Sequence, residues 1–302
     1  MNAVLIIDKP SGLTSHDVVN RVRRILRERS GGHVGTLDPM ATGVLPLVVG
    51  NLTRLAQFYT SSEKTYEGTI RFGFATDTYD AEGDPTSATQ AVSLSLGDIR
   101  QFAMRFQGKI EQIPPPFSAK KVGGVPAYKL ARKHAEFELK AVPVEIKQFE
   151  ITEVDKDRAP FRARVASGTY MRAVAHDMGQ LMGCGAHLES LRRTSVGEFQ
   201  LTDACTLEEL QAASEKGQAE ELFIPPRKLL PQLPSITANA EMAARIRTGR
   251  PVNLPELSQS KLVKVFAGQR ELLAIATRVA GTLFHAKIVL SPEKQVAQRE
   301  AR

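Results

Sequence analysis

A single acidic side chain in a glycine-rich segment is the first candidate for chemistry. Asp38 lies in the run GHVGTLDPMATG at 32–43, three residues after Gly35 and directly before Pro39. Glycine lets a backbone approach a bulky ligand closely and proline stiffens a turn, so this segment can present a carboxylate to a cleft. An aspartate before proline also orders its own turn, and the local sequence leaves both interpretations open.

Phosphate loops and metal sites are the main alternatives for such residues, and neither pattern fits. The run 32–43 lacks the terminal Gly-Lys-Ser/Thr and the GxGxxG spacing, and a strand-like run at 44–49 follows it instead of a helix. The six histidines show no HExxH pairing, and the acids at 77–84 lack the spacing of a calcium loop. We therefore expect no metal and no cofactor, and we interpret the acids as a polar turn.

The elements around Asp38 follow from hydrophobic periodicity. The run 4–7 predicts a buried strand, and Thr14 or Ser15 can cap a helix whose apolar face includes Val18, Val22 and Leu26. We expect further strands over 65–74, 142–154 and 161–165, and helices over 96–106 and 169–181. Because strands and helices mix without βαβ regularity, the pattern predicts an α+β fold with a mixed or antiparallel sheet flanked by helices.

A second, smaller domain is predicted at the C-terminal end. After Pro225-Pro226 and a proline-spaced linker at 229–234, short strand-like runs occur at 262–266, 272–277 and 283–290. We therefore divide the chain into a body at 1–233 and a small β domain at 234–302.

The basic residues are unevenly distributed along the chain. Residues 227–302 hold 13 Lys and Arg against 5 Asp and Glu, whereas residues 1–226 hold 27 against 28. A second excess lies in an insert at about 113–143, which contains Lys120 and Lys121 among six basic residues, against two acids. Two separated basic surfaces favour an extended phosphate backbone over a small acidic metabolite.

Compartment follows from what the sequence lacks. Its two cysteines, Cys184 and Cys205, form no CxxC pair, so neither a disulfide framework nor a zinc ribbon is expected. No run approaches the roughly 18 apolar residues of a membrane span, and the N-terminus lacks the pattern of a secretory signal. We expect a cytoplasmic protein with no membrane contact.

The segment at 32–46 closely resembles the catalytic motif of the TruB family of tRNA pseudouridine synthases, GHxGxLDPxATGxLP. Further segments match in the family's order, at 5–12, at 64–66 with Gly73 and 76–83, at 167–172, and at 183–188 with 191–193. The likeness covers roughly residues 3–230, and the tail resembles the family's PUA-type β domain more loosely.

The resemblance implies roles for three residues above all. Asp38 matches the nucleophilic aspartate, and attack on C6 of the base or on C1′ of the ribose both stay open. Arg172 matches the arginine that pairs with this aspartate, where a guanidinium would keep the carboxylate ionised and oriented. Tyr66 matches a tyrosine that stacks on the target base and assists proton transfer. Without the motif, Arg172 would be interpreted as a surface charge and Tyr66 as a core residue.

The resemblance also implies a set of substrate-binding positions. Lys9 belongs both to this set and to a motif that supports the active-site loop, and His33 braces the position that a flipped nucleotide leaves. The full set is His33, Leu191, Gly35, Lys9, Tyr170, Lys120 and Lys121.

The implied activity is isomerisation of uridine 55 in the T loop of tRNA after the nucleotide is flipped out of its stack. The insert at 113–143 corresponds to a mobile thumb that closes on the T stem-loop, and the tail domain to a contact with the acceptor end of tRNA. We expect a monomer without an obligate protein partner, and an additional role in folding tRNA is compatible with the family. The alternatives are an RNA-guided synthase of the dyskerin type and an RNA-binding module or folding chaperone without catalysis.

Overall fold

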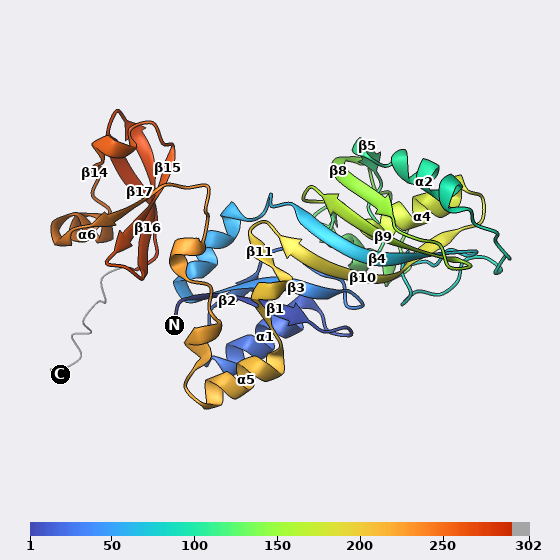
Figure 1. Ribbon diagram of the computed structural model, residues 1–302, viewed down its shortest axis with the longest axis horizontal. Coiled ribbons are helices and arrows are strands. Elements are labelled where there is room, and N and C mark those ends of the chain that lie inside the picture. Colours follow the sequence, from blue (N-terminus) through green and yellow to red (C-terminus); the bar gives the residue numbers. More distant parts are fainter. Residues whose placement is uncertain (292–302) are drawn as a thin grey trace.

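The computed structural model describes residues 1–291 and contains two main sheets (Figure 1). Asp38 lies in the connection between strands β2 and β3 of the larger sheet, at 34–41, which we call the Asp38 loop. Ten strands of this described part form the larger sheet, in the order β12-β1-β3-β10-β4-β9-β8-β5, with β2 beside β3 and β11 beside β10. Their bounds are β1 Ala3–Lys9, β2 Gly31–His33, β3 Thr42–Val49, β4 Lys64–Phe72, β5 Gly108–Gln112, β8 Val142–Ile151, β9 Arg158–Val165, β10 Ala186–Val196, β11 Phe199–Gln200 and β12 Ala204–Cys205.

The sheet is mixed, as the sequence predicted. β1 pairs with β12, and β3 with β10, in parallel, whereas the other pairs of this sheet are antiparallel. Between β3 and β10 only two residue pairs are in register, Arg192 with Thr42 and Arg193 with Gly43. The sheet therefore consists of two well-paired halves with a short junction between them, and the Asp38 loop enters β3 at this junction. The expected α+β fold is confirmed.

Helices cover one face of this sheet (Figure 1). Their bounds are α1 Ser15–Ile25, α2 Leu96–Met104, α4 Met171–Leu181 and α5 Leu207–Glu215. Along β1 the side chains alternate, so that Leu5 and Ile7 pack into the core with these helices while Val4 and Ile6 pack into a second core on the other face. Burial on both faces explains the unbroken apolar run at the start of the chain.

The first helix is fixed by its N-terminus. Thr14 caps α1 and forms a capping box with Asp17, which satisfies backbone N–H groups of the first turn. The next residue, Ser15, is buried and exchanges hydrogen bonds with the backbone of Leu37, since its hydroxyl accepts from Leu37 N at 2.8 Å and donates to Leu37 O at 3.1 Å. The start of α1 thus holds the residue that precedes Asp38.

Several boundaries differ from those expected. The segment 32–43 is not entirely loop, because Gly31–His33 pairs with β3 as strand β2. Helix α4 starts at Met171, two residues later than predicted, because Tyr170 has an extended backbone and its N–H donates to Gln112 Oε1 at 2.9 Å. Strand β9, expected over 161–165, already starts at Arg158.

The insert at 113–143 contains little regular structure. Strands β6 (Lys121–Val122) and β7 (Val125–Pro126) form a hairpin, and α3 (Ala127–Ala131) follows. Gly123 and Gly124 are the two-residue turn of this hairpin, and both have positive φ (56° and 84°).

The C-terminal sheet lies at the far end of the molecule from α2 and α4 (Figure 1). Its strands, in the order β13-β15-β16-β17-β14, are β13 Ser235–Ala238, β14 Val252–Asn253, β15 Leu262–Ala267, β16 Glu271–Ala280 and β17 Leu283–Val289, and α6 (Ala240–Arg247) packs against it. Between the two sheets lie η1 (Gly50–Phe58) and the linker. Within residues 1–291, no helix is long and apolar enough to cross a membrane.

The C-terminal sheet shares a hydrophobic core with the body. Phe266 and Ile275 belong to one cluster with Leu55, Tyr59 and Phe199 of the body. The linker is fixed as well, because the buried Lys264 ammonium donates to the carbonyls of two linker residues, Leu229 at 2.7 Å and Arg227 at 3.3 Å. The small domain is therefore docked rather than loosely tethered.

Phe266→Ala tests this docking. The Phe266 side chain is fully buried, and the Arg227 guanidinium lies 4.2 Å from its ring centroid. We expect the substitution to lower the free energy of unfolding by about 3–5 kcal/mol, because it removes apolar contacts and leaves a cavity. Thermal and denaturant unfolding measure this, with Val279→Ala, at a side chain 62% exposed, expected within about 0.5 kcal/mol of wild type. Equal stability of the two variants would contradict a shared core.

Candidate active site

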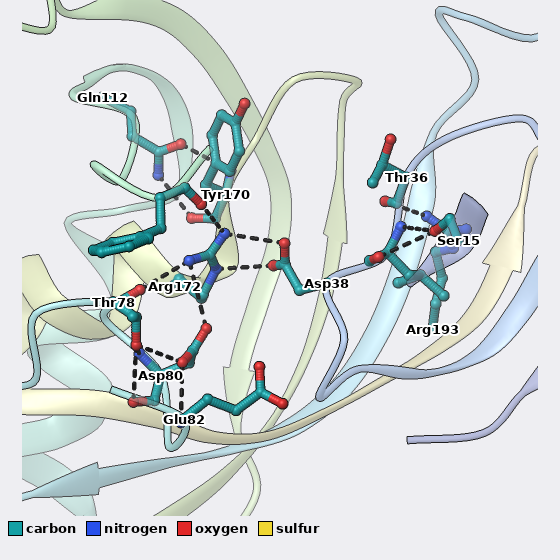
Figure 2. A network of polar contacts seen from close by, with 12 residues as sticks. Ser15, Thr36, Asp38, Thr78, Asp80, Glu82, Gln112, Tyr170, Arg172 and Arg193 are labelled. Carbon is teal, nitrogen blue, oxygen red and sulfur yellow. Dashed lines mark hydrogen bonds and ion pairs between the residues drawn. The ribbon is translucent and has the colours of Figure 1, made fainter. Parts of the chain in front are cut away.

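A bidentate ion pair between Asp38 and Arg172 forms the centre of the site (Figure 2). Arg172 Nε donates to Asp38 Oδ2 at 2.8 Å, and Arg172 Nη2 donates to Asp38 Oδ1 at 3.0 Å. The Arg172 side chain is 4% exposed, whereas that of Asp38 is 33% exposed. The pair therefore presents its anion to solvent and keeps its cation inside.

The guanidinium makes four hydrogen bonds and one further ion pair. Besides the two bonds to Asp38, Nη1 donates to Thr78 O at 2.8 Å and lies 3.4 Å from Asp80 Oδ2, and Nη2 donates to Phe117 O at 2.9 Å. A planar guanidinium hydrogen-bonded at all three nitrogens cannot rotate without losing hydrogen bonds, so the orientation of Arg172 is fixed before any ligand binds.

Asp80 is a buried member of this network that the sequence did not single out. We interpreted the acids at 77–84 as a polar turn, but the Asp80 side chain is 5% exposed and pairs with Arg172. Thr78 Oγ1 donates to Asp80 Oδ1 at 2.6 Å, and Glu82 N donates to the same oxygen at 3.1 Å (Figure 2). A buried carboxylate among surface acids has no local sequence signal, because only the fold brings α4 against this turn.

Glu82 is a second acidic residue beside Asp38. Partial burial raises the pKa of its carboxyl group, and the negative charges of Asp80 and Asp38 raise it further. Glu82 also lines a hollow of about 860 Å³, together with Met40 and Leu191. Asp38, Arg172 and Tyr66 are not among the residues that line this hollow.

The Asp38 loop is supported from below by Lys9. This lysine is fully buried, and its ammonium donates to the carbonyls of Pro10 and Pro39 at 2.9 Å each and of Ala41 at 2.6 Å. Burial lowers the pKa of Lys9 to about 8, although Asp38 and Glu82 oppose this shift. Its geometry is that of a support for the loop, with no surface left for direct contact with a ligand.

Tyr66 and Leu191 occupy neighbouring strands on the core side of the site. Both side chains are 8% exposed, on β4 and β10. Tyr66 lies close to Arg193, a buried arginine whose pKa is lowered by burial while Tyr66 and Asp38 act to raise it. Tyr66 and Asp38 therefore approach the same guanidinium.

His33 lies on β2, half-buried, and its Nδ1 is buried without a hydrogen-bond partner in the described part of the chain. Burial lowers the pKa of this imidazole, and the charge of Arg193 lowers it further. A largely neutral ring next to the Asp38 loop can pack against a base.

Tyr170 links the insert to the ion pair. Its backbone N–H and carbonyl exchange hydrogen bonds with the Gln112 side chain (2.9 and 3.1 Å), and burial raises the pKa of its phenol. Lys120 and Lys121 are exposed near the β6–β7 hairpin of the same insert that supplies Phe117 O to Arg172. The structure thus joins Asp38 and Arg172 directly, places Tyr170 two residues before Arg172 at the start of α4, and connects the two lysines to this site only through the insert.

A stacked aromatic pair lies behind Arg172. The rings of Tyr79 and His176 are 3.7 Å apart at 10°, and Tyr79 has a positive φ of 66°. The next residue along α4, Asp177, is mostly buried, which raises the pKa of its carboxyl group from 3.8 to about 6. The stack joins the 77–84 turn to α4 and so supports the Arg172–Asp80 contact.

Comparisons with known proteins point to one family. Residues 23–171 match the family model for the N-terminal domain of TruB family pseudouridylate synthases, and residues 172–233 match the model for the tRNA pseudouridylate synthase B C-terminal domain. A relative from Solibacter usitatus named tRNA pseudouridine synthase B is 47% identical over 294 residues, covering 96% of this chain and 100% of the relative. One from Geobacter sulfurreducens with the same name is 40% identical over 288 residues, covering 93% and 95%.

Two solved structures share the architecture. The similar chain in a Cbf5-Nop10-Gar1 complex aligns with a TM-score of 0.72 and 25% identity, covering 96% of this chain and 85% of that chain. The one in an archaeal box H/ACA sRNP Nop10-Cbf5 complex aligns with a TM-score of 0.69 and 26% identity, covering 97% and 87%. Both alignments extend over the C-terminal sheet as well as the body.

Asp177→Asn provides a test of the packing behind the ion pair. Because the pKa of Asp177 is higher in the folded state (about 6) than its ordinary 3.8, the folded protein binds more protons between these values. The free energy of unfolding therefore falls as the pH rises from about 4 to about 6. Asparagine does not ionise, so the variant does not lose this stability. We expect the melting temperature of the variant to exceed that of wild type by a few °C more at pH 7.5 than at pH 4.5.

Thermal unfolding at the two pH values measures the difference. The control is Glu153→Gln, which replaces an exposed carboxylate on the β8–β9 connection and should change the stability by no more than about 0.5 kcal/mol. A gap for Asp177→Asn that is the same at both pH values would mean that this carboxyl group ionises freely.

Proposed function

The chain belongs to the TruB family of pseudouridylate synthases, and we propose that it converts one uridine in the T loop of tRNA, position 55, to pseudouridine with Asp38 as the nucleophile. The activity class follows from the family, since relatives named tRNA pseudouridine synthase B match nearly the whole chain. The T-loop position and the roles of individual residues are our proposal.

The reaction sets clear demands on the protein. The N1–C1′ bond of the uridine breaks, the base rotates, a C5–C1′ bond forms, and the proton on C5 leaves while N1 gains one. No atom is added and no electron is transferred, so the protein must supply a group that stabilises the separated parts and a path for one proton.

Asp38 meets the first demand through its pair with Arg172, and this observation carries the proposal. An isolated carboxylate in a cleft that closes on a base would be desolvated, but the bidentate guanidinium compensates its charge and fixes both oxygens. Since the Asp38 side chain stays 33% exposed, it remains accessible to a substrate atom. The arrangement supports a nucleophile that is oriented in advance.

Tyr66 is proposed to stack on the base and to assist proton removal from C5. It reaches the site from β4, and Leu191 on the adjacent β10 lines the same hollow as Met40 and Glu82. Because a stacked uridine hides both C1′ and C5, the nucleotide must leave its stack at a cost of a few kcal/mol, which contacts elsewhere on the RNA must offset.

Two parts of the chain are proposed to supply those contacts. The insert at 113–143, with Lys120 and Lys121, would close on the T stem-loop as a thumb, with Phe117 O as its connection to Arg172. The small domain at 234–302 would contact the acceptor end as a PUA-like module, since residues 227–302 carry most of the basic excess. Gly35, Tyr170 and His33 would border the flipped nucleotide.

A cytoplasmic monomer that needs no cofactor and no obligate partner is the simplest form of this enzyme. The second candidate is an RNA-guided synthase, favoured only by the likeness to chains solved in Cbf5 complexes. At 47% identity over its full length, the Solibacter usitatus relative supports the stand-alone tRNA enzyme more strongly.

Incubation of the purified protein with an unmodified tRNA transcript tests the proposal. We expect pseudouridine at one T-loop uridine without added protein or RNA, and a loss of at least about 10⁴-fold in rate for Asp38→Asn, because the amide is neutral and a poor nucleophile. Base-resolution mapping of pseudouridine gives both results.

Glu221→Gln, an exposed acid outside the hollow replaced in the same way, serves as the matched control and should retain full activity. Activity of Asp38→Asn near that of wild type would exclude the nucleophile, and product that appears only with added partner proteins or guide RNA would favour the second candidate.

A further inference from the structure

We infer that Arg193 is a positioning residue for the reaction, which holds the Asp38 loop in register with Tyr66 and Arg172 across the junction of the two sheet halves. The inference deepens the proposed function and rests on it, because it assigns the group that sets the geometry of the same site.

Arg193 is among the largest fully buried side chains of the described protein, with 0% exposure. Its guanidinium donates to three backbone carbonyls of the segment around Asp38: Nε to Val44 O at 2.8 Å, Nη2 to Gly35 O at 2.9 Å and Nη1 to Thr36 O at 3.3 Å. One side chain therefore grips the Asp38 loop on its N-terminal side and the strand that follows it.

The glycines of the loop fit around this arginine. At Gly43 (φ +98°) an added Cβ would overlap the Arg193 carbonyl oxygen, so a side chain is excluded by the close approach of β3 to β10. At Gly35 (φ +78°) an added Cβ would lie 3.4 Å from Arg193 Nη1. The two glycines on either side of Asp38 in the sequence thus lie against Arg193, Gly43 against its backbone and Gly35 against its side chain.

The position of Arg193 in the sheet explains why its hydrogen bonds to the Asp38 loop affect the geometry of the site. Asp38 enters from the half built on β1 and β3, whereas Tyr66 on β4 and Arg172 on α4 belong to the other half. β10 pairs with β4 along nearly its whole length but with β3 at only two residue pairs. Few backbone bonds fix one half against the other, and the Arg193 side chain adds three at this point.

The charge of Arg193 is held without a direct carboxylate partner among the hydrogen bonds of residues 1–291. The titratable groups that face it are Tyr66, Asp38, Lys64, Lys9 and His33. A buried cation costs several kcal/mol unless it is well solvated by its surroundings, and an apolar side chain would fill the same space at less cost. The arginine is explained by its three hydrogen bonds to the Asp38 loop and β3. Neither lysine nor methionine can bind three carbonyls in one plane.

Arg193→Lys tests the inference, with a single-turnover rate, tRNA affinity and melting temperature measured on the same preparation. We expect the variant to stay folded and to bind tRNA within about threefold of wild type, while the rate falls about 100-fold, the scale of a loop misplaced by about 1 Å. Arg193→Met should lose more. The matched control is Arg71→Lys on the neighbouring β4, which alters a partly exposed ion pair with Asp157 and should leave rate and affinity unchanged.

A second variant keeps the test decisive if both substitutions at position 193 prevent folding. Gly35→Ala leaves the charge in place but strains the residue whose carbonyl Nη2 binds. Gly217→Ala imposes almost the same strain (φ +73°) at the end of α5, with no atom within 4 Å of the added methyl group. We expect a rate loss with retained affinity for Gly35→Ala alone.

The outcomes separate the two claims. If wild type forms no pseudouridine, the proposed function fails. If wild type is active and folded Arg193→Lys keeps its rate, or loses rate only in proportion to affinity, the positioning role is overturned while the function stands. Equal rates for Gly35→Ala and Gly217→Ala would overturn it likewise.

Discussion

The site depends on one ion pair whose two ends meet different environments. Asp38 is partly exposed and Arg172 is almost fully buried, so the guanidinium must find acceptors inside the protein for every donor that the carboxylate does not take. Those acceptors come from the 77–84 turn (Thr78 and Asp80) and from the insert (Phe117). The geometry of a single arginine thereby ties together α4, a surface turn and the segment proposed to close on RNA, and loosening any of them would free the fork to rotate.

Much of this arrangement could be predicted from the sequence, but only where the signal is local. The Thr14 cap, the apolar run that became β1 and the glycine-framed Asp38 each depend on neighbouring residues, and the mixed sheet followed from the order of the elements. The motif resemblance suggested Arg172 and Tyr66. No local pattern could indicate that Asp80 is buried, because an acid among acids in a turn is usually solvated and only packing against α4 removes it from water. Helix ends moved for the same reason, as at Tyr170, whose N–H bonds to Gln112 instead of continuing α4.

The Asp38 loop shows how a non-helical, non-strand segment can be rigid. Ser15 satisfies both backbone groups of Leu37, Lys9 binds the carbonyls of Pro39 and Ala41, and Arg193 binds those of Gly35 and Thr36. Buried backbone groups without partners are costly, so each of these side chains stabilises one particular path of the chain. The segment has few alternatives to that path, which is what a site made for one geometry requires.

The shared core between the body and the C-terminal sheet changes how the two parts can act on a long ligand. A module on a flexible tether loses conformational freedom whenever it engages at the same time as its neighbour, and that loss weakens binding. Here the packing of Phe266 and Ile275 against Leu55 and Tyr59 has already removed that freedom during folding. The body and the C-terminal sheet therefore keep a fixed distance from each other. A ligand can bind to both only if its two contact points lie at that distance, so we expect an RNA with a shortened or lengthened stem to lose one of the two contacts.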